Sequence, residues 1–369
     1  MPRWWTGLRF LGAGALAIAA LWVASEWLDP VYPATRASMA AFRGRRSQVE
    51  VVTVGNSHSR AISFAALDMP GVHFWLDGQD ALEAAFLARY AAERAPRLRY
   101  VLLTASYDFH HHDNAMQSRV DRSGPRREIY ARTPTFGYIP GDFDLWAGAK
   151  IAPVVRPDHW RGVARRLLRP SVPVRDPVTG WNHLPSPPVP SADLLVRYGL
   201  MRATQQRDGA AEALALDPAV SARVLGSVES LARDLRSRGA YLVLYTPPYH
   251  ETFRRHFPHA VPQLRSALAP LLQRNPNAVW LDFSADTAFT AHTELFYNSS
   301  HLNPRGAKAF SARLAACLRR LPATGTPPAD PCRSISNSRA HTEAQRHGGA
   351  VLQDSRSYRD SDRTAPLTP

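Results

Sequence analysis

The chain has 369 residues, enough for one large domain or two small ones, and its hydrophobic fraction of 45% is ordinary for a globular protein. Its formal net charge of +14 comes almost entirely from arginine, because Lys150 and Lys308 are the only lysines. A basic surface can attract nucleic acid, anionic lipid or acidic glycan. The sequence lacks zinc-finger spacings, aromatic RNA-binding motifs and long basic helices, so we expect no nucleic-acid partner.

The N-terminal segment predicts a membrane anchor. An apolar stretch at residues 10–25 follows Arg3 and Arg9, and tryptophans flank it on both sides. Counted over residues 4–28, it is long enough to cross a bilayer with aromatic side chains at both interfaces. We expect residues 1–28 to form an uncleaved signal anchor, with a cleaved secretory signal and a buried soluble helix as the alternatives.

This anchor predicts a single-pass protein of the cell inner membrane whose main domain is extracytoplasmic, in the periplasm. Four arginines close behind the segment favour the opposite orientation, because positive residues prefer the cytoplasmic side. They are Arg36, Arg43, Arg45 and Arg46.

Strand and helix patterns alternate after a Pro- and Arg-containing linker expected at residues 29–48. The expected strands are residues 49–54, 72–76, 100–104, 241–245 and 278–283, and the expected helices are residues 61–67, 80–93, 218–238, 259–272 and 303–321. Such alternation favours a parallel sheet with helices on both faces. The sequence therefore predicts an α/β fold, a three-layer sandwich with a central parallel sheet, over residues 49–321.

Two segments depart from this alternation. Residues 110–191 are rich in proline, glycine and aromatic residues, and we expect them to form an insertion over the active edge of the sheet, with a helix near residues 159–168. Their aromatic side chains either stack on sugar rings or only cover the sheet. Residues 322–369 are rich in Ser, Arg and Pro and predict a disordered C-terminal tail. Cys317 and Cys332 are either a disulfide formed in an oxidising compartment or two free thiols.

Ser57 stands where the expected strand 49–54 turns through Gly55 into a helical segment. A sharp turn of this kind presents a hydroxyl at the mouth of the strand and directs backbone N–H groups at the same space. These groups are the nucleophile and the oxyanion donors that covalent acyl transfer requires. The alternative is an ordinary turn whose serines cap the helix.

His301 stands in the loop before the last expected helix, which Asn303 and Pro304 predict as N-cap and first helical residue. A loop in this place lies at the carboxyl ends of the strands, where ligands bind in α/β sheets. A single loop histidine can also be structural. Because Ser57 is expected at the same edge, the two side chains form a candidate catalytic pair.

The segments Gly55-Asn56-Ser57-His58-Ser59 and Asn298-Ser299-Ser300-His301 resemble the first and last motif blocks, G-D-S-x-S and D-x-x-H, of the SGNH (GDSL-type) hydrolase superfamily. Within it the chain is similar to the membrane-anchored acyl-transfer branch that includes DltD-like proteins and O-acetyltransferase partners. The two blocks bracket residues 49–321 in the family's order. The resemblance implies an SGNH or flavodoxin-like fold, with Ser57 as the nucleophile and His301 as the general base.

The same resemblance implies the oxyanion donors. They are the N–H of Ser57, the N–H of Gly78 after the second expected strand, and a hydroxyl of Ser106 or Tyr107 after the third. The family has an asparagine at that last place, so the sequence departs from its pattern there.

The first and last blocks also depart from the pattern. Asn56 replaces the aspartate of the first block, and Asn298 replaces the aspartate that orients the histidine. Asn298 can still orient His301, as asparagine does in cysteine proteases, so it is a candidate catalytic residue, and a Ser–His dyad is an alternative. A carboxylate from elsewhere is another, and its candidates are Asp282, Asp286 and Glu294.

Further residues are expected to line the cleft. Tyr249 and His250 follow the fourth expected strand, where an ordinary strand-ending turn is the alternative, and Asn56 and His58 flank the nucleophile, where His58 can instead cap or pack. The run His110-His111-His112-Asp113 suggests metal ligands, but adjacent histidines point in different directions and no second ligand cluster accompanies them. We therefore expect neither a metal nor another cofactor.

Together these inferences predict a membrane-anchored acyl esterase or acyltransferase, most simply an acetyl one, acting on a cell-envelope or secreted glycan. The resemblance implies a multi-pass membrane O-acyltransferase as the partner that donates the acyl group. Two alternatives stay open. One is a non-catalytic SGNH-fold domain that binds glycan or scaffolds an export or acylation complex, and the other is a membrane-surface lipase.

Overall fold

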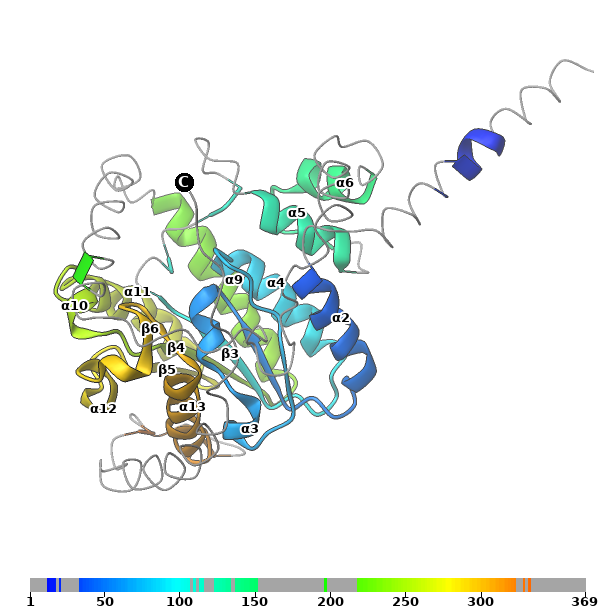
Figure 1. Ribbon diagram of the computed structural model, residues 1–369. Helices are drawn as coiled ribbons and strands as arrows, with labels where there is room; N and C mark the ends of the chain where they lie inside the picture. Colours follow the sequence, from blue (N-terminus) through cyan, green and yellow to red (C-terminus); the bar gives the residue numbers. More distant parts are fainter. Residues whose placement is uncertain are drawn as a thin grey trace, which may run out of the picture.

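A computed structural model describes residues 12–17, 20, 33–106, 109–110, 113–115, 123–133, 137–151, 196–197, 218–322, 328 and 331–332 (Figure 1). Most of the expected anchor at residues 1–28, most of the expected tail at residues 322–369 and the helix expected at residues 159–168 lie outside these residues. None of the helices in the described part of the chain combines the length and apolar character needed to cross a membrane.

The centre of the molecule is a five-stranded parallel sheet with the strand order β2-β1-β3-β4-β5. Its strands are β1 (Val51–Val54), β2 (Gly71–His73), β3 (Tyr100–Thr104), β4 (Tyr241–Thr246) and β5 (Ala278–Asp282). Strands β1 to β4 are buried along their whole length. Burial on both faces explains why they are near-continuous apolar runs rather than alternating patterns. All five expected strands are confirmed.

Helices cover both faces of the sheet, which gives the three layers of an α/β sandwich (Figure 1). Successive side chains of a strand point to opposite faces, so Val52 and Val54 of β1 join one apolar core and Val51 joins the other. The first core is covered by α2 (Pro33–Arg45), α4 (Ala81–Ala92), α9 (Pro218–Arg236) and α11 (Ala260–Arg274), and the second by α3 (Phe64–Leu67), α12 (Thr287–Thr290) and α13 (Pro304–Leu318).

Helix α2 occupies most of the segment that the sequence predicts as a linker, residues 29–48. Met39 and Phe42 lie one helical turn apart and are each 1% exposed. The Phe42 ring packs edge-on against Phe74, with centroids 5.2 Å apart. The rest of the helix consists of small residues, one proline and three arginines, which hide this short apolar face in the composition.

The helix expected at residues 61–67 is also corrected, because the structure divides this region into two short elements. A 3₁₀ turn, η1 (Ser57–Ala61), begins at Ser57 itself, and α3 begins after Ser63. The Ser63 N–H donates to the Ser311 hydroxyl of α13 over 2.7 Å, and the Ser63 side chain caps α3. Ser57 therefore stands on a tight turn rather than ahead of a continuous helix.

The described part of the insertion contains α5 (Ser123–Arg132) and α6 (Phe143–Ile151), neither of which was expected. Helix α5 directs Arg126, which is 0% exposed, into a group of four buried carboxylates. The group is named here the Arg126 cluster and consists of Arg126, Asp80, Glu83, Asp113 and Asp142. Burial disfavours the charge on Arg126, but the four carboxylates outweigh it and raise the pKa of the guanidinium.

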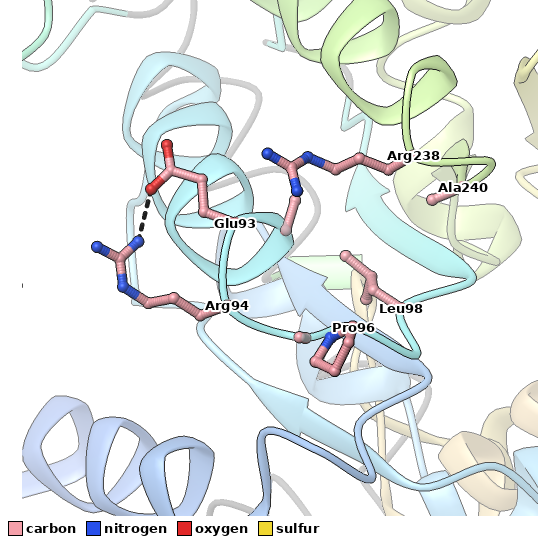
Figure 2. A pocket seen from close by; sticks show the side chains of 8 residues that line it. Glu93, Arg94, Pro96, Leu98, Arg238 and Ala240 are labelled. Atoms are coloured by element: carbon pink, nitrogen blue, oxygen red, sulfur yellow. Dashed lines mark hydrogen bonds and ion pairs between the residues drawn. The ribbon is translucent and has the colours of Figure 1, made fainter.

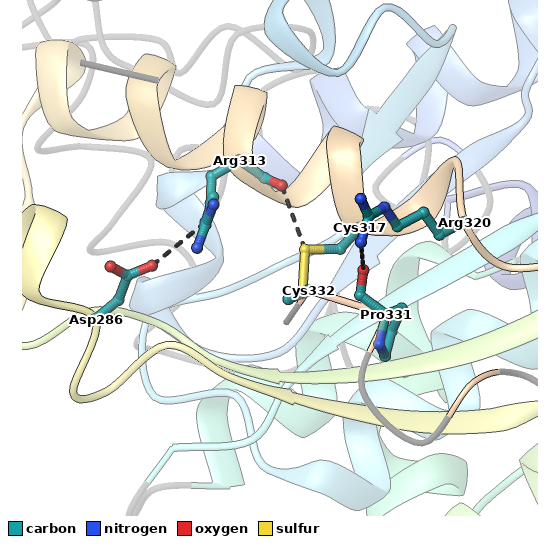
Figure 3. The surroundings of a disulfide bond; sticks show 6 residues. All are labelled: Asp286, Arg313, Cys317, Arg320, Pro331 and Cys332. Atoms are coloured by element: carbon teal, nitrogen blue, oxygen red, sulfur yellow. Dashed lines mark hydrogen bonds and ion pairs between the residues drawn. A yellow bond between two sulfur atoms is a disulfide. The ribbon is translucent and has the colours of Figure 1, made fainter. Parts of the chain in front are cut away.

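The end of α13 is tied to the following segment by a disulfide between Cys317 and Cys332, whose Cα atoms lie 4.9 Å apart (Figure 3). The Arg320 guanidinium donates to the carbonyl of Pro331 over 3.4 Å beside it. About one turn before Cys317 in the same helix, Arg313 pairs with Asp286 at 3.5 Å. Of the two states considered for the cysteines, the structure therefore has the bonded one.

Candidate active site

The turn after β1 depends on Gly55, which has a φ of +118°. A Cβ at this position would lie 3.0 Å from Cβ of Thr104 and in a backbone region that side chains rarely adopt, so the turn requires glycine. The Gly55 N–H donates to the Gln79 side chain over 2.6 Å, and the Ser59 hydroxyl donates to the carbonyl of Val54 over 2.9 Å. Strand order reverses between β1 and β3, so Ser57 stands at the switch point where α/β sheets bind ligands.

The structure brings Ser57 and His301 together although 244 positions separate them. The Ser57 Oγ atom lies 2.7 Å from Nε2 of His301. His301 belongs to β7 (His301–Leu302), which pairs with β6 (Phe296–Asn298) in a small antiparallel ribbon. Helix α13 starts at Pro304 directly behind this ribbon and packs against η1, so it fixes the distance between the two side chains.

Asn298 sets the tautomer of His301. Its Oδ1 atom accepts the backbone N–H groups of Ser300 and His301, both over 3.0 Å, which identifies this atom as the carbonyl oxygen. The same oxygen lies 3.0 Å from Nδ1 of His301, so Nδ1 carries the proton and donates it. Nε2 is then the unprotonated nitrogen that accepts the Ser57 hydroxyl, as a general base requires.

The three carboxylates considered for orienting His301 are engaged elsewhere. Asp282 pairs with Arg265 at 3.5 Å, Asp286 caps α12, and Glu294 lies 3.0 Å from Nδ1 of His292. The side chains at Nδ1 of His301 are instead Asn298 and the Ser300 hydroxyl, which lies 2.9 Å away. Both of these side chains, Asn298 and Ser300, are neutral.

Of the expected oxyanion residues, Ser106 contacts Asn56 beside Ser57, and Gly78 precedes Gln79, which accepts the Gly55 N–H. Gly78 has a φ of +71°, and its carbonyl accepts the Asn114 side chain over 2.9 Å. Ser106 is 1% exposed, and its hydroxyl accepts Nδ2 of Asn56 over 2.8 Å. That bond joins the carboxyl ends of β1 and β3. Tyr107 lies outside the described residues.

His58 packs against the other histidine of the site. Its ring stacks on the ring of His301, with centroids 4.4 Å apart and planes inclined by 5°. Asn56 caps η1 and accepts the backbone N–H and the ring Nδ1–H of His58, over 3.1 and 3.0 Å. Both histidines line a small pocket at the nucleophile, whose wall consists of Ser57, His58, Arg60, Ala61, Pro247, Ser300, His301 and Leu302.

Tyr249 and His250, which the sequence predicts as substrate contacts, are both buried, at 3% and 5% exposure, and neither lines the pocket at the nucleophile. His250 caps α10 (Glu251–Arg254), and its ring Nδ1 accepts the Thr252 N–H over 3.3 Å. Burial lowers the pKa of His250 and so favours this neutral role. Tyr249 packs edge-on against His58 at 5.5 Å, so it supports the site from behind.

The two described residues of the run 110–113, His110 and Asp113, are buried and have structural contacts. His110 is 5% exposed, and Asp113 belongs to the Arg126 cluster and also pairs with Arg223 of α9 at 2.7 Å. His111 and His112 lie outside the described residues. Among the residues that are described, no group of three or more His, Cys, Asp or Glu side chains could hold a metal ion.

Sequence reasoning missed Ser300, Gln79 and the Arg126 cluster. Ser300 is a variable position of the last motif block, so only the fold shows that its hydroxyl reaches the His301 ring. Gln79 directly follows Gly78, and adjacency to an expected oxyanion residue is the one signal that could have found it. Arg126 lies in the segment that carried no periodicity.

A second pocket lies at the opposite edge of the sheet and is separate from this site (Figure 2). Its walls come from the end of α4 and from the segments that lead into β3 and β4. Glu93 and Arg94 pair across 2.6 Å at its rim, and Arg238 extends over it. Ser57 follows the other end of its strand, so this pocket has no part in the chemistry of the Ser57–His301 pair.

The described residues thus contain one serine hydroxyl paired with a correctly protonated histidine, placed at the switch point of a parallel sheet. No protein-family model and no curated protein matches the chain.

Proposed function

We propose that the chain is a serine-dependent acyl esterase or acyltransferase of the SGNH type. The observation that supports this most is the line from Ser57 Oγ to His301 Nε2, at 2.7 Å, and from His301 Nδ1 to Asn298 Oδ1, at 3.0 Å. The strand order β2-β1-β3-β4-β5, with the site between β1 and β3, is that of flavodoxin-like sheets and accords with the same proposal.

The proposed reaction has two steps. His301 Nε2 takes the proton of the Ser57 hydroxyl while Oγ attacks the carbonyl carbon of the acyl ester, and the proton then passes to the leaving oxygen as its bond to the acyl carbon breaks. The acyl group is now an ester of Ser57. In the second step His301 takes a proton from water or from a sugar hydroxyl, whose oxygen attacks the acyl carbon. His301 then gives this proton to Ser57 Oγ as the bond between Oγ and the acyl carbon breaks, which restores the Ser57 hydroxyl.

Backbone N–H groups of the Ser57 turn and of the Gly78 loop are proposed to stabilise the negative charge on the carbonyl oxygen in both steps. The Gln79 side chain holds these two segments together through the N–H of Gly55. The hydroxyl of Ser106 is the proposed third donor.

We further propose an extracytoplasmic location, with residues 1–28 as the anchor, a cell-envelope or secreted glycan as acceptor, and a multi-pass membrane O-acyltransferase as donor partner. The Cys317–Cys332 disulfide supports an oxidising compartment. The net charge of +14 supports an acidic polymer as the partner surface.

A fluorophosphonate probe tests the proposed nucleophile in the purified full-length protein. We expect the wild type and the exposed-site control Ser237→Ala to be labelled, and Ser57→Ala to be unlabelled. A folded wild type that stays unlabelled would overturn the proposal and favour a non-catalytic glycan-binding protein. Faster hydrolysis of long-chain than of acetyl p-nitrophenyl esters by wild type that has not been treated with the probe would indicate a lipase instead of an acetyl esterase.

The variant Asn298→Asp is expected to be faster than the wild type. The carboxylate keeps the oxygen that accepts Nδ1–H and adds a negative charge beside the imidazolium that forms in each step, which is worth roughly a tenfold gain in kcat/KM. Because His301 must be unprotonated to act, the acid limb of the pH profile moves up by about one pH unit. Steady-state rates with p-nitrophenyl acetate measure both effects.

Asn298→Ala is the matched control and is expected to lose activity, because it frees the His301 ring while adding no charge. Equal rates and equal acid limbs in wild type and Asn298→Asp would mean that Asn298 does not contact His301 in solution.

A further inference from the structure

The two histidines at the site are held in the same way. Oδ1 of Asn298 accepts the backbone and ring N–H groups of His301, and Oδ1 of Asn56 accepts those of His58. The backbone donors fix both oxygens as acceptors, so each ring carries its proton on Nδ1. The rings lie parallel, with planes inclined by 5° and centroids 4.4 Å apart.

Hydrogen-bond partners of the His301 ring lie at its edge, with Asn298 and Ser300 at Nδ1 and Ser57 at Nε2. Bonds at the edge resist a tilt of the ring less than a contact against its face does, and a tilt moves Nε2 away from Ser57. Contact against the face of the ring prevents that rotation, and His58 makes this contact. A displacement of about 1 Å at a reacting group can lower a rate about 100-fold.

His58 is itself immobilised from behind. It is 6% exposed, and Tyr249 packs edge-on against its ring. Asn56, which accepts its Nδ1–H, donates in turn to the buried Ser106 hydroxyl after β3 over 2.8 Å. The end of β3 thereby positions His301 through Asn56 and His58.

The stack also affects charge. When Ser57 attacks, His301 becomes an imidazolium against the face of His58, which a neutral ring tolerates and a protonated ring opposes. His58 faces His301, Tyr249 and Asn56. The charged side chain of Arg60 lines the same pocket and pairs with Asp77 at 3.4 Å. Two rings this close accept one proton far more readily than two, so they titrate as a coupled pair.

From this geometry we propose that His58 is a positioning residue that holds the plane of His301 and keeps the stacked pair singly protonated during acyl transfer. This inference rests on the proposed function, because it gives His58 a part in the same reaction.

Kinetics of His58→Ala and His58→Phe test the positioning role. The alanine variant removes the stacked ring and is expected to lower kcat for p-nitrophenyl acetate about 10- to 100-fold, with KM within about twofold. The phenylalanine variant keeps a flat ring and is expected to retain kcat within about threefold at neutral pH. The exposed His259 offers a matched control, because its side chain caps nothing and His259→Ala should match the wild type.

An NMR titration of the His301 ring in Ser57→Ala protein tests the coupling without requiring turnover. We expect a flattened, two-step curve in this background and a single-proton curve once His58→Phe is added. Unchanged kcat in His58→Ala, or a His301 titration that His58→Phe leaves unaltered, would overturn the inference. Wild type that neither labels nor turns over would instead overturn the proposed function, and the titration would still decide whether the rings are coupled.

Discussion

Replacing His301 with alanine is expected to lower kcat for p-nitrophenyl acetate hydrolysis on the order of 10⁴-fold while the protein stays folded. The Ser57 hydroxyl lies 2.7 Å from Nε2, and without this base its proton has no acceptor in the line to Asn298. Oxyanion donors and substrate binding survive the change, so some rate above that of water remains. Active-site-titrated kinetics and a thermal melt on the same samples measure the two quantities.

His292→Ala is the control for this experiment. His292 lies in the same region of the chain, just before η2 (Thr293–Leu295), and contacts Glu294 rather than Ser57. Its removal should leave kcat unchanged. If His301→Ala keeps more than about a tenth of the wild-type kcat with an intact fold, the general-base role of His301 is wrong.

Replacing Arg126 with methionine is expected to lower the free energy of unfolding by about 3–5 kcal/mol, the usual cost of removing one partner from a buried ion pair. Methionine fills similar space but leaves four buried carboxylates, of which only Asp113 and Asp142 pair with a second cation among the described residues, Arg223. Arg126→Lys should recover little, because a single ammonium cannot replace the fork of donors that reaches all four. Urea denaturation followed by tryptophan fluorescence measures the change.

The loss should depend on pH with a defined sign. Burial and the nearby Asp80 raise the pKa of Glu83, and Arg126 is the group that opposes this shift. When an acid has a higher pKa in the folded than in the unfolded protein, the free energy of unfolding falls as pH rises between these two pKa values. Removing Arg126 raises the folded-state pKa of Glu83 further and so enlarges this fall. The deficit of Arg126→Met is therefore expected to be larger at about pH 8 than at about pH 5.

Arg274→Met is the matched control. Arg274 pairs with Glu229 at 2.7 Å, but its side chain is 58% exposed, so its loss should lower the free energy of unfolding far less than the loss of Arg126 does. Similar losses in the two variants, or a deficit for Arg126→Met that grows toward acid pH, would show that the cluster carries no buried, uncompensated charge.

The sheet could be predicted from the sequence because its strands are buried on both faces and form clear apolar runs. Strands β3 and β4 begin at the expected residues Tyr100 and Tyr241. Helix α2 could not, since Met39 and Phe42 are its only large apolar side chains and the others are small residues, a proline and arginines. Helix α5 was missed for a different reason: its buried face includes Arg126, which hydrophobic periodicity treats as a surface residue.

The Ser57–His301 pair was accessible to sequence reasoning, because each residue follows a local signal that places it at the carboxyl edge of the sheet. The geometry around it was not. Only the fold shows that Asn298 accepts the Nδ1 proton, that Ser300 lies at the same nitrogen, and that His58 stacks on His301. Nor could the sequence show that Tyr249 and His250 are buried, because Phe253 of α10 packs on Tyr249 and Phe296 of β6 packs on His250.

The position of the insertion in the chain has a consequence for folding. Strands β3 and β4 are neighbours in the centre of the sheet, yet residues 105–240 separate them in sequence. When the chain emerges from the ribosome, β3 stays an open edge until the ribosome has also released β4. The long sequence separation makes this pairing slow, and an apolar edge exposed for that time is a template for aggregation. Chaperone protection of the nascent N-terminal half is therefore expected to favour the folded product.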